Sequence, residues 1–371
     1  MENPDLDSLD TVLVTGGGGC LGSHIVDAFA AEGSCDSIAL TVRDPNKARR
    51  AVPGTAFHVC DVADREETRA LLEHVKPRII VHTVSPDYMA PKKAQYEINY
   101  LATKTLLELA RADANVQALI YTSSVMAVPL GHLSEPWTED EAPVNDLNTG
   151  EYYYNRTKGA ADTLVREASF PKPVDAKDWS GCLLTTCLRL SGIYGPRDTN
   201  ISPSILNLAN TAGARILFGP DTAMLEWVFV ESAAHAHLLA AKALLRNLSG
   251  VSGEAFFITD GKPMKFGDWC RTAWKEAGDA NMNSAHPSFF RTPFGPVLAL
   301  LAVWEWVYQL VTLGQGWPKT SRQTFFYIRH GCWFSIEKAR ARLGYEPLCG
   351  TEEGIKRTAR WFRENQGKKG M

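Results

Sequence analysis

The sequence predicts an α/β protein built on a doubly wound parallel sheet, with a smaller, mostly helical lobe in its C-terminal part. Three observations lead to this prediction. A glycine-rich turn at 15–22 joins the apolar run 12–14 to a helical stretch at 23–30. Short apolar runs then alternate with longer amphipathic stretches, which is typical of parallel strands joined by helices. Beyond Ile193 this alternation weakens, and helical segments rich in Trp and Phe dominate from Met264 onward.

The elements are expected in the following order. Aliphatic runs of strand length and amphipathic runs of helical spacing distinguish the two types, and a stretch rich in Pro, Glu, Asp and Asn marks a surface loop at 129–150. Strands are predicted at 12–14, 38–42, 78–82, 118–122, 183–190, 215–218, 227–230 and 256–259, and helices at 66–75, 97–112, 202–212, 232–245, 336–344 and 352–365. We expect 227–230 and 232–245 to return to the main sheet.

Composition excludes several classes of function. The chain has 371 residues, a net charge of −3 and 45% apolar residues, so neither a nucleic-acid partner nor disorder is expected. The eight cysteines are scattered without zinc spacing, which favours reduced core thiols. The acidic N-terminal residues 1–7 lack the apolar run of a secretory signal. We therefore expect a protein of the cytoplasm, or one at the cytosolic face of the endoplasmic reticulum.

The glycine turn predicts a phosphate-binding loop. Gly16, Gly19 and Gly22 have the spacing Thr-Gly-x-x-Gly-x-x-Gly between a strand and a helix. Residues without Cβ reach positive φ and let backbone N–H groups approach a pyrophosphate at the helix N-terminus. The sequence thus predicts a dinucleotide-binding domain of residues 8–192 plus 227–260, and a substrate-binding lobe of 193–226 plus 261–371.

Tyr154 and Lys158 predict an acid–base site. They are four residues apart on the helix expected after the 129–150 loop, so their side chains share one face. Lowering a tyrosine pKa from near 10 to about 7 requires roughly 4 kcal/mol of phenolate stabilisation, much of which a nearby ammonium supplies. Ser123 and Ser124 end a parallel strand, at the edge where ligands bind in such sheets.

Together these features resemble the extended short-chain dehydrogenase/reductases, and within them the 3β-hydroxysteroid dehydrogenase group, which includes sterol-4α-carboxylate 3-dehydrogenases. The resemblance covers the whole chain. The stretches that carry it are 15–22, 81–86, 121–124, 154–158, 189–196, 230–241, 253–259, 343–348 and 352–355. Three positions depart from the family's usual residues, since Cys20 replaces an aromatic residue or leucine, Leu190 a proline and Ala102 a glycine. The first two are expected to reshape the wall beside the nicotinamide.

The resemblance implies a Ser-Tyr-Lys site for hydride transfer. Tyr154 would exchange a proton with the substrate oxygen, Ser124 would hold that oxygen, and Lys158 would bind the nicotinamide ribose and lower the tyrosine pKa. Ser123 stays an alternative to Ser124, because adjacent strand residues point to opposite faces. The residues expected at the cofactor are Gly16, Gly18, Gly19, Cys20, Leu21 and Gly22 at the pyrophosphate, Asp61 and Val62 beside the adenine, and Thr83, Val84, Ser85, Asn99, Thr122, Leu190 and Ile193 with Tyr154 and Lys158 at the inner end.

The end of the second strand bears on which cofactor is used. An acidic residue there would bind the adenine ribose of NAD, but the chain has Thr41 and Arg43, with Lys47, Arg49 and Arg50 following. A carboxylate about 5 Å from a 2′-phosphate would cost roughly 3 kcal/mol, whereas Arg43 can form charge-assisted hydrogen bonds to it. We expect NADP(H) to be favoured over NAD(H). The use of NAD(H) stays open, and so does the alternative that Arg43 is only a solvated charge.

The apolar stretch 294–314 has three interpretations. In order of preference, it is a buried or substrate-facing helix of the lobe, a peripheral membrane contact, or a true membrane span. A span is disfavoured because the stretch falls short of about 20 apolar residues, and because Glu305 would cost about 2.5–3.5 kcal/mol within the bilayer. The expected partner is a hydrophobic small molecule, and a homodimer stays open.

The predicted reaction interconverts a secondary alcohol and a ketone on a bulky apolar ring of sterol, terpenoid or polyketide type. Decarboxylation would follow if a carboxylate lies β to the new ketone. Two alternatives stay open, an epimerase or dehydratase of the same superfamily that recycles its cofactor, and a nucleotide-sensing binding protein. No metal is expected, since His235 and His237, two residues apart on a helix, point in different directions.

Overall fold

A seven-stranded parallel sheet forms the centre of the N-terminal part in the computed structural model, which describes residues 8–44, 54–130, 135–313, 317–318 and 320–365. The strand order is β11-β6-β5-β4-β1-β2-β3. This arrangement confirms the predicted doubly wound parallel sheet. The strands are β1 (Asp10–Thr15), β2 (Cys35–Val42), β3 (Thr55–Val59), β4 (Ile79–His82), β5 (Ala118–Ser124), β6 (Leu184–Leu190) and β11 (Glu254–Ile258).

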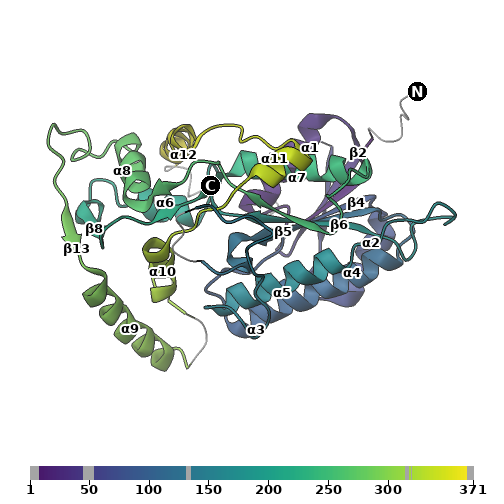
Figure 1. Ribbon diagram of the computed structural model, residues 1–371, viewed down its shortest axis with the longest axis horizontal. Coiled ribbons are helices and arrows are strands. Elements are labelled where there is room, and N and C mark those ends of the chain that lie inside the picture. The colour runs from purple at the N-terminus through teal and green to yellow at the C-terminus, as the bar shows by residue number, and fades with distance from the viewer. Residues whose placement is uncertain (1–7, 45–53, 131–134, 314–316, 319, 366–371) are drawn as a thin grey trace.

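Helices cover both faces of this sheet (Figure 1). One face packs against α1 (Cys20–Glu32), α7 (Val230–Leu245) and α11 (Glu337–Leu343). The other packs against α2 (Arg65–Val75), α4 (Thr103–Ala112) and α5 (Tyr153–Glu167). Successive strand residues therefore enter different cores, Val12 and Val14 the first and Leu13 the second. Burial on both faces explains why the central strands are mainly apolar.

The C-terminal lobe has a core of its own. Three pairs of short strands pack there with aromatic side chains, among which Tyr194 lies edge-on to Trp227 and Trp269. Its elements are β7 (Gly192–Tyr194), α6 (Ile201–Leu206), β8 (Ile216–Phe218), β9 (Met224–Leu225), β10 (Trp227–Phe229), β12 (Met264–Lys265), α8 (Phe266–Glu276), β13 (Phe290–Thr292), α9 (Phe294–Val311), α10 (Arg322–His330) and α12 (Thr351–Asn365). The division of the chain at 192/193, 226/227 and 260/261 stays a prediction.

Four elements differ from the prediction. β3 was not expected, because most of its side chains are exposed on the outer strand of the sheet. The prediction that 227–230 returns to the main sheet is wrong, since β10 pairs with β7, although α7 does pack on the sheet. The predicted helix 202–212 ends at Leu206. The helix expected at 97–112 is composed of α3 (Lys92–Gln95), the π-helical turn η3 (Tyr96–Ala102) and α4.

Helix α9 leaves most of its apolar surface exposed. It has the length and mean hydropathy, 1.5, of a candidate membrane span, and only 11% of it is buried. Its buried residue is Glu305, whose carboxylate accepts hydrogen bonds from the backbone N–H and Nε of Arg322 at 2.6 and 2.7 Å. Figure 1 shows α9 at the periphery, with α10 between it and the sheet. A helix buried within the lobe, part of the preferred interpretation, is not what the structure shows.

Candidate active site at the carboxyl edge of the sheet

The glycine turn closes tightly over the start of α1. Gly16 has a φ of +74°, and its N–H donates to the Thr41 hydroxyl at 3.0 Å. A Cβ on Gly22 would lie 2.3 Å from the Gly16 carbonyl oxygen, closer than any side chain permits. Thr41 is thus committed to the turn, a function that the sequence did not reveal.

The amino end of α1 fits a dinucleotide pyrophosphate. Gly19 precedes the helix without a side-chain cap, and the first turn carries no acidic residue, so its N–H groups face no competing carboxylate there. Cys20 and Leu21 lie on this turn, and Gly18 is exposed beside it. Burial raises the pKa of the Cys20 thiol to about 12, with Asp198 adding to this effect, so the thiol is neutral and leaves the site available for an anion.

Tyr154 lies between two serine hydroxyls. It stands on the first turn of α5, and its phenol hydrogen-bonds to Ser124 at the end of β5 and to Ser85 in the segment after β4. The Ser124 Oγ accepts the Met126 N–H at 3.1 Å, which leaves its O–H available as a donor. The chain therefore brings Ser124 and Tyr154 together, as predicted for an alcohol-binding pair.

The pleat of β5 separates the two serines. Ser123 points toward α5 and donates to the buried Asp162 carboxylate at 2.7 Å. Thr122, on the opposite face, hydrogen-bonds to His237 Nε2 at 2.9 Å. Thr122 thus directs its hydroxyl to α7 and Ser123 directs its own to Asp162, which favours Ser124 of the two predicted alternatives.

Lys158 is buried beneath the sheet edge. Its ammonium donates to the Thr122 carbonyl at 3.0 Å and the Tyr121 hydroxyl at 3.3 Å, and its side chain is 2% exposed. Burial lowers the pKa of Lys158 to about 7. The prediction that Lys158 lowers the Tyr154 pKa is not met here, because burial raises the pKa of Tyr154 and the groups that oppose this are the Ser85 and Ser124 hydroxyls.

Asn99 connects Ser85 to α5. It is fully buried in η3, where its Oδ1 accepts from Ser85 at 2.9 Å and its Nδ2 donates to Thr157 at 3.1 Å. π-Helical turns occur frequently at functional sites because they redirect a side chain out of the regular helical register. Asn99 thus holds one of the two hydroxyls that contact Tyr154.

The remaining predicted cofactor residues surround this edge. The Thr83 hydroxyl donates to the Thr15 carbonyl at 2.7 Å, and Val84 borders Gly16. Leu190 is buried opposite Ser124 in the sheet register. The others are Asp61, whose carboxylate accepts the Ala63 N–H, Val62 in the core, Ile193 on β7 and the exposed Arg43 beyond β2, whereas Lys47, Arg49 and Arg50 lie outside the described residues.

Three buried polar residues were given no role in the site by the sequence reasoning. His82 hydrogen-bonds to Thr15 at 2.7 Å and Thr103 at 3.2 Å, and burial lowers its pKa to about 3, so it is neutral. His237 is neutral for the same reason, with a pKa of about 4. Asp162 lies one helical turn, four residues, beyond Lys158, and this spacing could have been recognised in the sequence. No group of His, Cys, Asp or Glu within the described ranges could hold a metal ion.

Comparisons with known proteins place this geometry in context. The model of the 3-beta hydroxysteroid dehydrogenase/isomerase family matches residues 13–287. The decarboxylating sterol-4-alpha-carboxylate 3-dehydrogenase of Gibberella zeae is 32% identical over 302 residues, which are 81% of this chain and 96% of that protein. The enzyme of the same name from Saccharomyces cerevisiae is 29% identical over 374 residues, covering 97% of this chain and 99% of its own.

The fold is also similar to that of solved structures. A dTDP-glucose 4,6-dehydratase from Bacillus anthracis, solved in complex with NAD, matches with a TM-score of 0.69 and 16% identity, covering 96% of this chain and 97% of that one. At this identity the likeness concerns the fold alone.

Replacing Gly22 by alanine is expected to weaken dinucleotide binding at least tenfold, because the new Cβ would meet the Gly16 carbonyl oxygen and displace the turn. Fluorescence titration with NADPH and NADH measures this loss. Gly295→Ala serves as the matched control, since its Cβ meets open space. Equal affinity in the Gly22→Ala variant and wild type would contradict the assignment of the turn.

Proposed function

The chain belongs to the 3-beta hydroxysteroid dehydrogenase/isomerase family, and we propose that it oxidises a ring hydroxyl to a ketone on a sterol that carries a neighbouring carboxyl group. Members of the family are oxidoreductases that act on CH–OH groups with a nicotinamide cofactor. The observation that best supports the proposal is the contact of the Tyr154 phenol with Ser124, one helical turn from Lys158 at the carboxyl end of β5.

Each residue has a defined task in this proposal. The bound nicotinamide supplies a hydride acceptor for the carbinol carbon. Ser124 donates its O–H to the substrate oxygen, because its own Oγ already accepts the Met126 N–H. Tyr154 as phenolate takes the hydroxyl proton, and Lys158 binds the ribose from its buried position. The groups that oppose the effect of burial on the pKa of Tyr154 are the Ser85 and Ser124 hydroxyls.

The same tyrosine serves a second step. A carboxylate β to the new ketone leaves as carbon dioxide when the electron pair of its C–C bond moves into the enol. Tyr154, protonated by the oxidation, then donates its proton to the ketone oxygen. The fungal relatives are named as decarboxylating enzymes, which supports a decarboxylation after the oxidation.

The end of β2 supports a preference for NADP(H) over NAD(H). Thr41 has no carboxylate that would repel a 2′-phosphate, and its hydroxyl accepts a hydrogen bond from the Gly16 N–H. Arg43, the first residue after the strand, is exposed and is the residue that would bind a 2′-phosphate.

We propose further that the exposed face of α9 lies on a lipid surface. The face combines aliphatic side chains with two tryptophans, a composition typical of helices at a membrane interface. Its large exposed residues are Leu300, Val303, Trp304, Trp306, Val307, Leu310 and Val311. The acid of the helix, Glu305, turns inward to Arg322 and so keeps its charge away from this face.

The position of α9 relative to Tyr154 favours a bilayer as the occupant. Arg322 begins α10. On that helix Phe326 packs edge-on to Tyr152, and Tyr327 is close enough to Tyr154 for the charge of the ionised Tyr154 phenol to raise the pKa of Tyr327. A sterol partitions into membranes. Contact of α9 with a bilayer would therefore place the catalytic phenol, one helix away, near the substrate. At about 27 Å the helix is slightly shorter than the hydrocarbon core, which favours surface contact over a span.

Tyr154→Phe is expected to lower kcat/KM for a sterol alcohol by 10²- to 10⁴-fold, roughly the contribution of general acid–base catalysis, while cofactor affinity is kept. Tyr153→Phe, which alters the adjacent phenol on the same helix, is the control and should leave turnover near wild type. Steady growth of reduced-nicotinamide absorbance supports a dehydrogenase. Turnover without such growth indicates an epimerase or dehydratase. If Tyr154→Phe leaves the function of the protein unchanged, the chain is a binding protein.

Arg43→Ala is expected to weaken NADP(H) binding by roughly 10- to 100-fold, the value of a charge-assisted hydrogen bond, and to leave NAD(H) binding unchanged. Binding titrations with both cofactors measure the difference. Arg357→Ala, on the distant α12, controls for the loss of a surface charge. Equal losses for the two cofactors, or none, would overturn the NADP(H) preference.

Sterol-containing phosphatidylcholine vesicles are expected to float with the wild-type protein. The double variant Val303→Asp/Trp306→Asp should reduce the floated fraction by roughly tenfold or more, since it places two charges on the face of α9. Val59→Asp, at an exposed apolar position on β3, is the control. If wild type does not float, and gel filtration shows a dimer that the α9 variant abolishes, a second copy covers α9 instead.

A further inference from the structure

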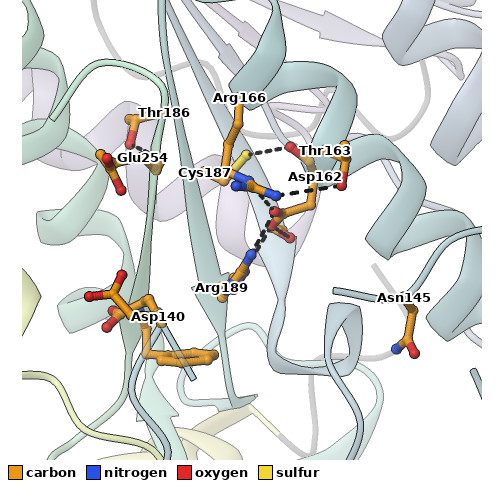
Figure 2. Close-up of polar contacts among 12 residues, drawn as sticks. Asp140, Asn145, Asp162, Thr163, Arg166, Thr186, Cys187, Arg189 and Glu254 are labelled. Carbon is orange, nitrogen blue, oxygen red and sulfur yellow. Dashed lines mark hydrogen bonds and ion pairs between the residues drawn. The ribbon is translucent and has the colours of Figure 1, made fainter. Parts of the chain in front are cut away.

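A fully buried carboxylate connects three elements of the site. Asp162 lies on α5 four residues beyond Lys158 and is 0% exposed. It accepts the Ser123 hydroxyl at 2.7 Å, the Arg189 Nε and Nη2 at 3.0 and 2.8 Å, and the Arg166 Nε at 3.0 Å. Figure 2 shows the carboxylate between the two guanidinium groups, with the Cys187 thiol directed to the same helix.

The two strand partners stand next to residues of the proposed site. Ser123 precedes Ser124 on β5 and Arg189 precedes Leu190 on β6, and the strands pair in the register Ser123 with Arg189 and Ser124 with Leu190. One carboxylate thus holds the carboxyl ends of both strands to the helix that carries Tyr154 and Lys158.

We propose that Asp162 is a positioning residue for the dehydrogenase reaction, because it fixes Ser124 and the Lys158 ammonium relative to Tyr154 through its bonds to Ser123 and Arg189. The inference rests on the proposed function. It concerns a residue that touches neither substrate nor cofactor and acts through its neighbours.

The charge of Asp162 is constant over the working range of pH. Burial by itself would raise the pKa of this carboxyl, but Arg189, with help from Ser123 and Arg166, brings it below its usual value. The Arg189 guanidinium, 1% exposed, is correspondingly held in its charged form. Asp162 is therefore ionised at neutral pH, and it acts as a fixed anion.

That anion helps to keep Lys158 protonated. Burial lowers the pKa of Lys158 to about 7, and Cys187 and Asp162 oppose this decrease. Burial raises the pKa of the Cys187 thiol far above neutrality, so the thiol is uncharged and Asp162 is the anion that matters. The other titratable or charged groups around the pair are Tyr154 and Arg166 on α5, Tyr121 on β5, Arg189 on β6, the neutral His82 on β4, and Glu139, which lies near Arg189.

The first test measures Asp162→Asn against Arg166→Gln. Without the anion, the pKa of Lys158 falls, so the protonated form is lost at lower pH and the alkaline limb of kcat/KM for oxidation should move about half to one unit to lower pH, with kcat reduced about tenfold and the cofactor KM changed less. Arg166→Gln removes the partly exposed arm of the same cluster and should leave the profile in place. An unshifted profile in Asp162→Asn would overturn the proposal.

The second test separates positioning from stability. Asp162→Leu/Arg189→Met replaces both buried charges by apolar side chains, an exchange that is often neutral for folding. We expect its melting temperature to recover relative to Asp162→Asn while kcat stays low, because Ser123 has lost its carboxylate partner. Recovery of wild-type kcat in this folded variant would show that Asp162 is only structural.

A third measurement does not depend on turnover. ¹³Cε-lysine NMR, with Lys158→Met for assignment, reports the Lys158 titration in the protein without substrate. The midpoint should fall in Asp162→Asn and stay unchanged in Arg166→Gln, and an unmoved midpoint in Asp162→Asn counts against the inference. If wild type oxidises no sterol alcohol while the NMR shift is observed, the proposed function fails and only the electrostatic coupling of Asp162 to Lys158 stands.

Discussion

The site depends on one constraint, the cost of burying a polar side chain at the carboxyl edge of the sheet without a hydrogen-bond partner. A buried polar group without one costs a large part of the stability of a domain. Here the Lys158 ammonium has the Thr122 carbonyl and the Tyr121 hydroxyl, and His82 lies between two threonine hydroxyls. The partners that satisfy these groups also determine where they point. Stability and the alignment of the site are consequently achieved by the same hydrogen bonds.

Most of the sheet was predictable because its strands are buried on both faces. Runs such as 12–14 and 118–121 are apolar at every position, a pattern typical of a parallel strand covered on both faces. β3 was missed since three of its five residues are exposed and the pattern is weak. β10 was misplaced because the sequence shows only that its residues are buried. Its pairing with β7 depends on contacts that no local pattern encodes.

The candidate site was predictable in its residues more than in their geometry. Helical spacing placed Tyr154 and Lys158 on one face of α5. It did not show that burial would raise the pKa of the first and lower that of the second, because desolvation depends on residues from distant parts of the chain. Nor did it separate Ser123 from Ser124, which required the register of the pleat. Asp162 had a readable spacing, but its importance comes from Arg189, which is 27 residues away.

Glu305 also determines how α9 is turned about its own axis. A helix that is apolar on nearly all sides has no preferred rotation in a nonpolar environment, since each roll angle presents a similar surface. A single carboxylate with two hydrogen bonds to Arg322 removes that degeneracy. Rolling the helix by half a turn would expose this anion on the outer face and break both bonds. The outward direction of Trp306, next along the chain, is therefore set by an ion pair on the inward side of the helix.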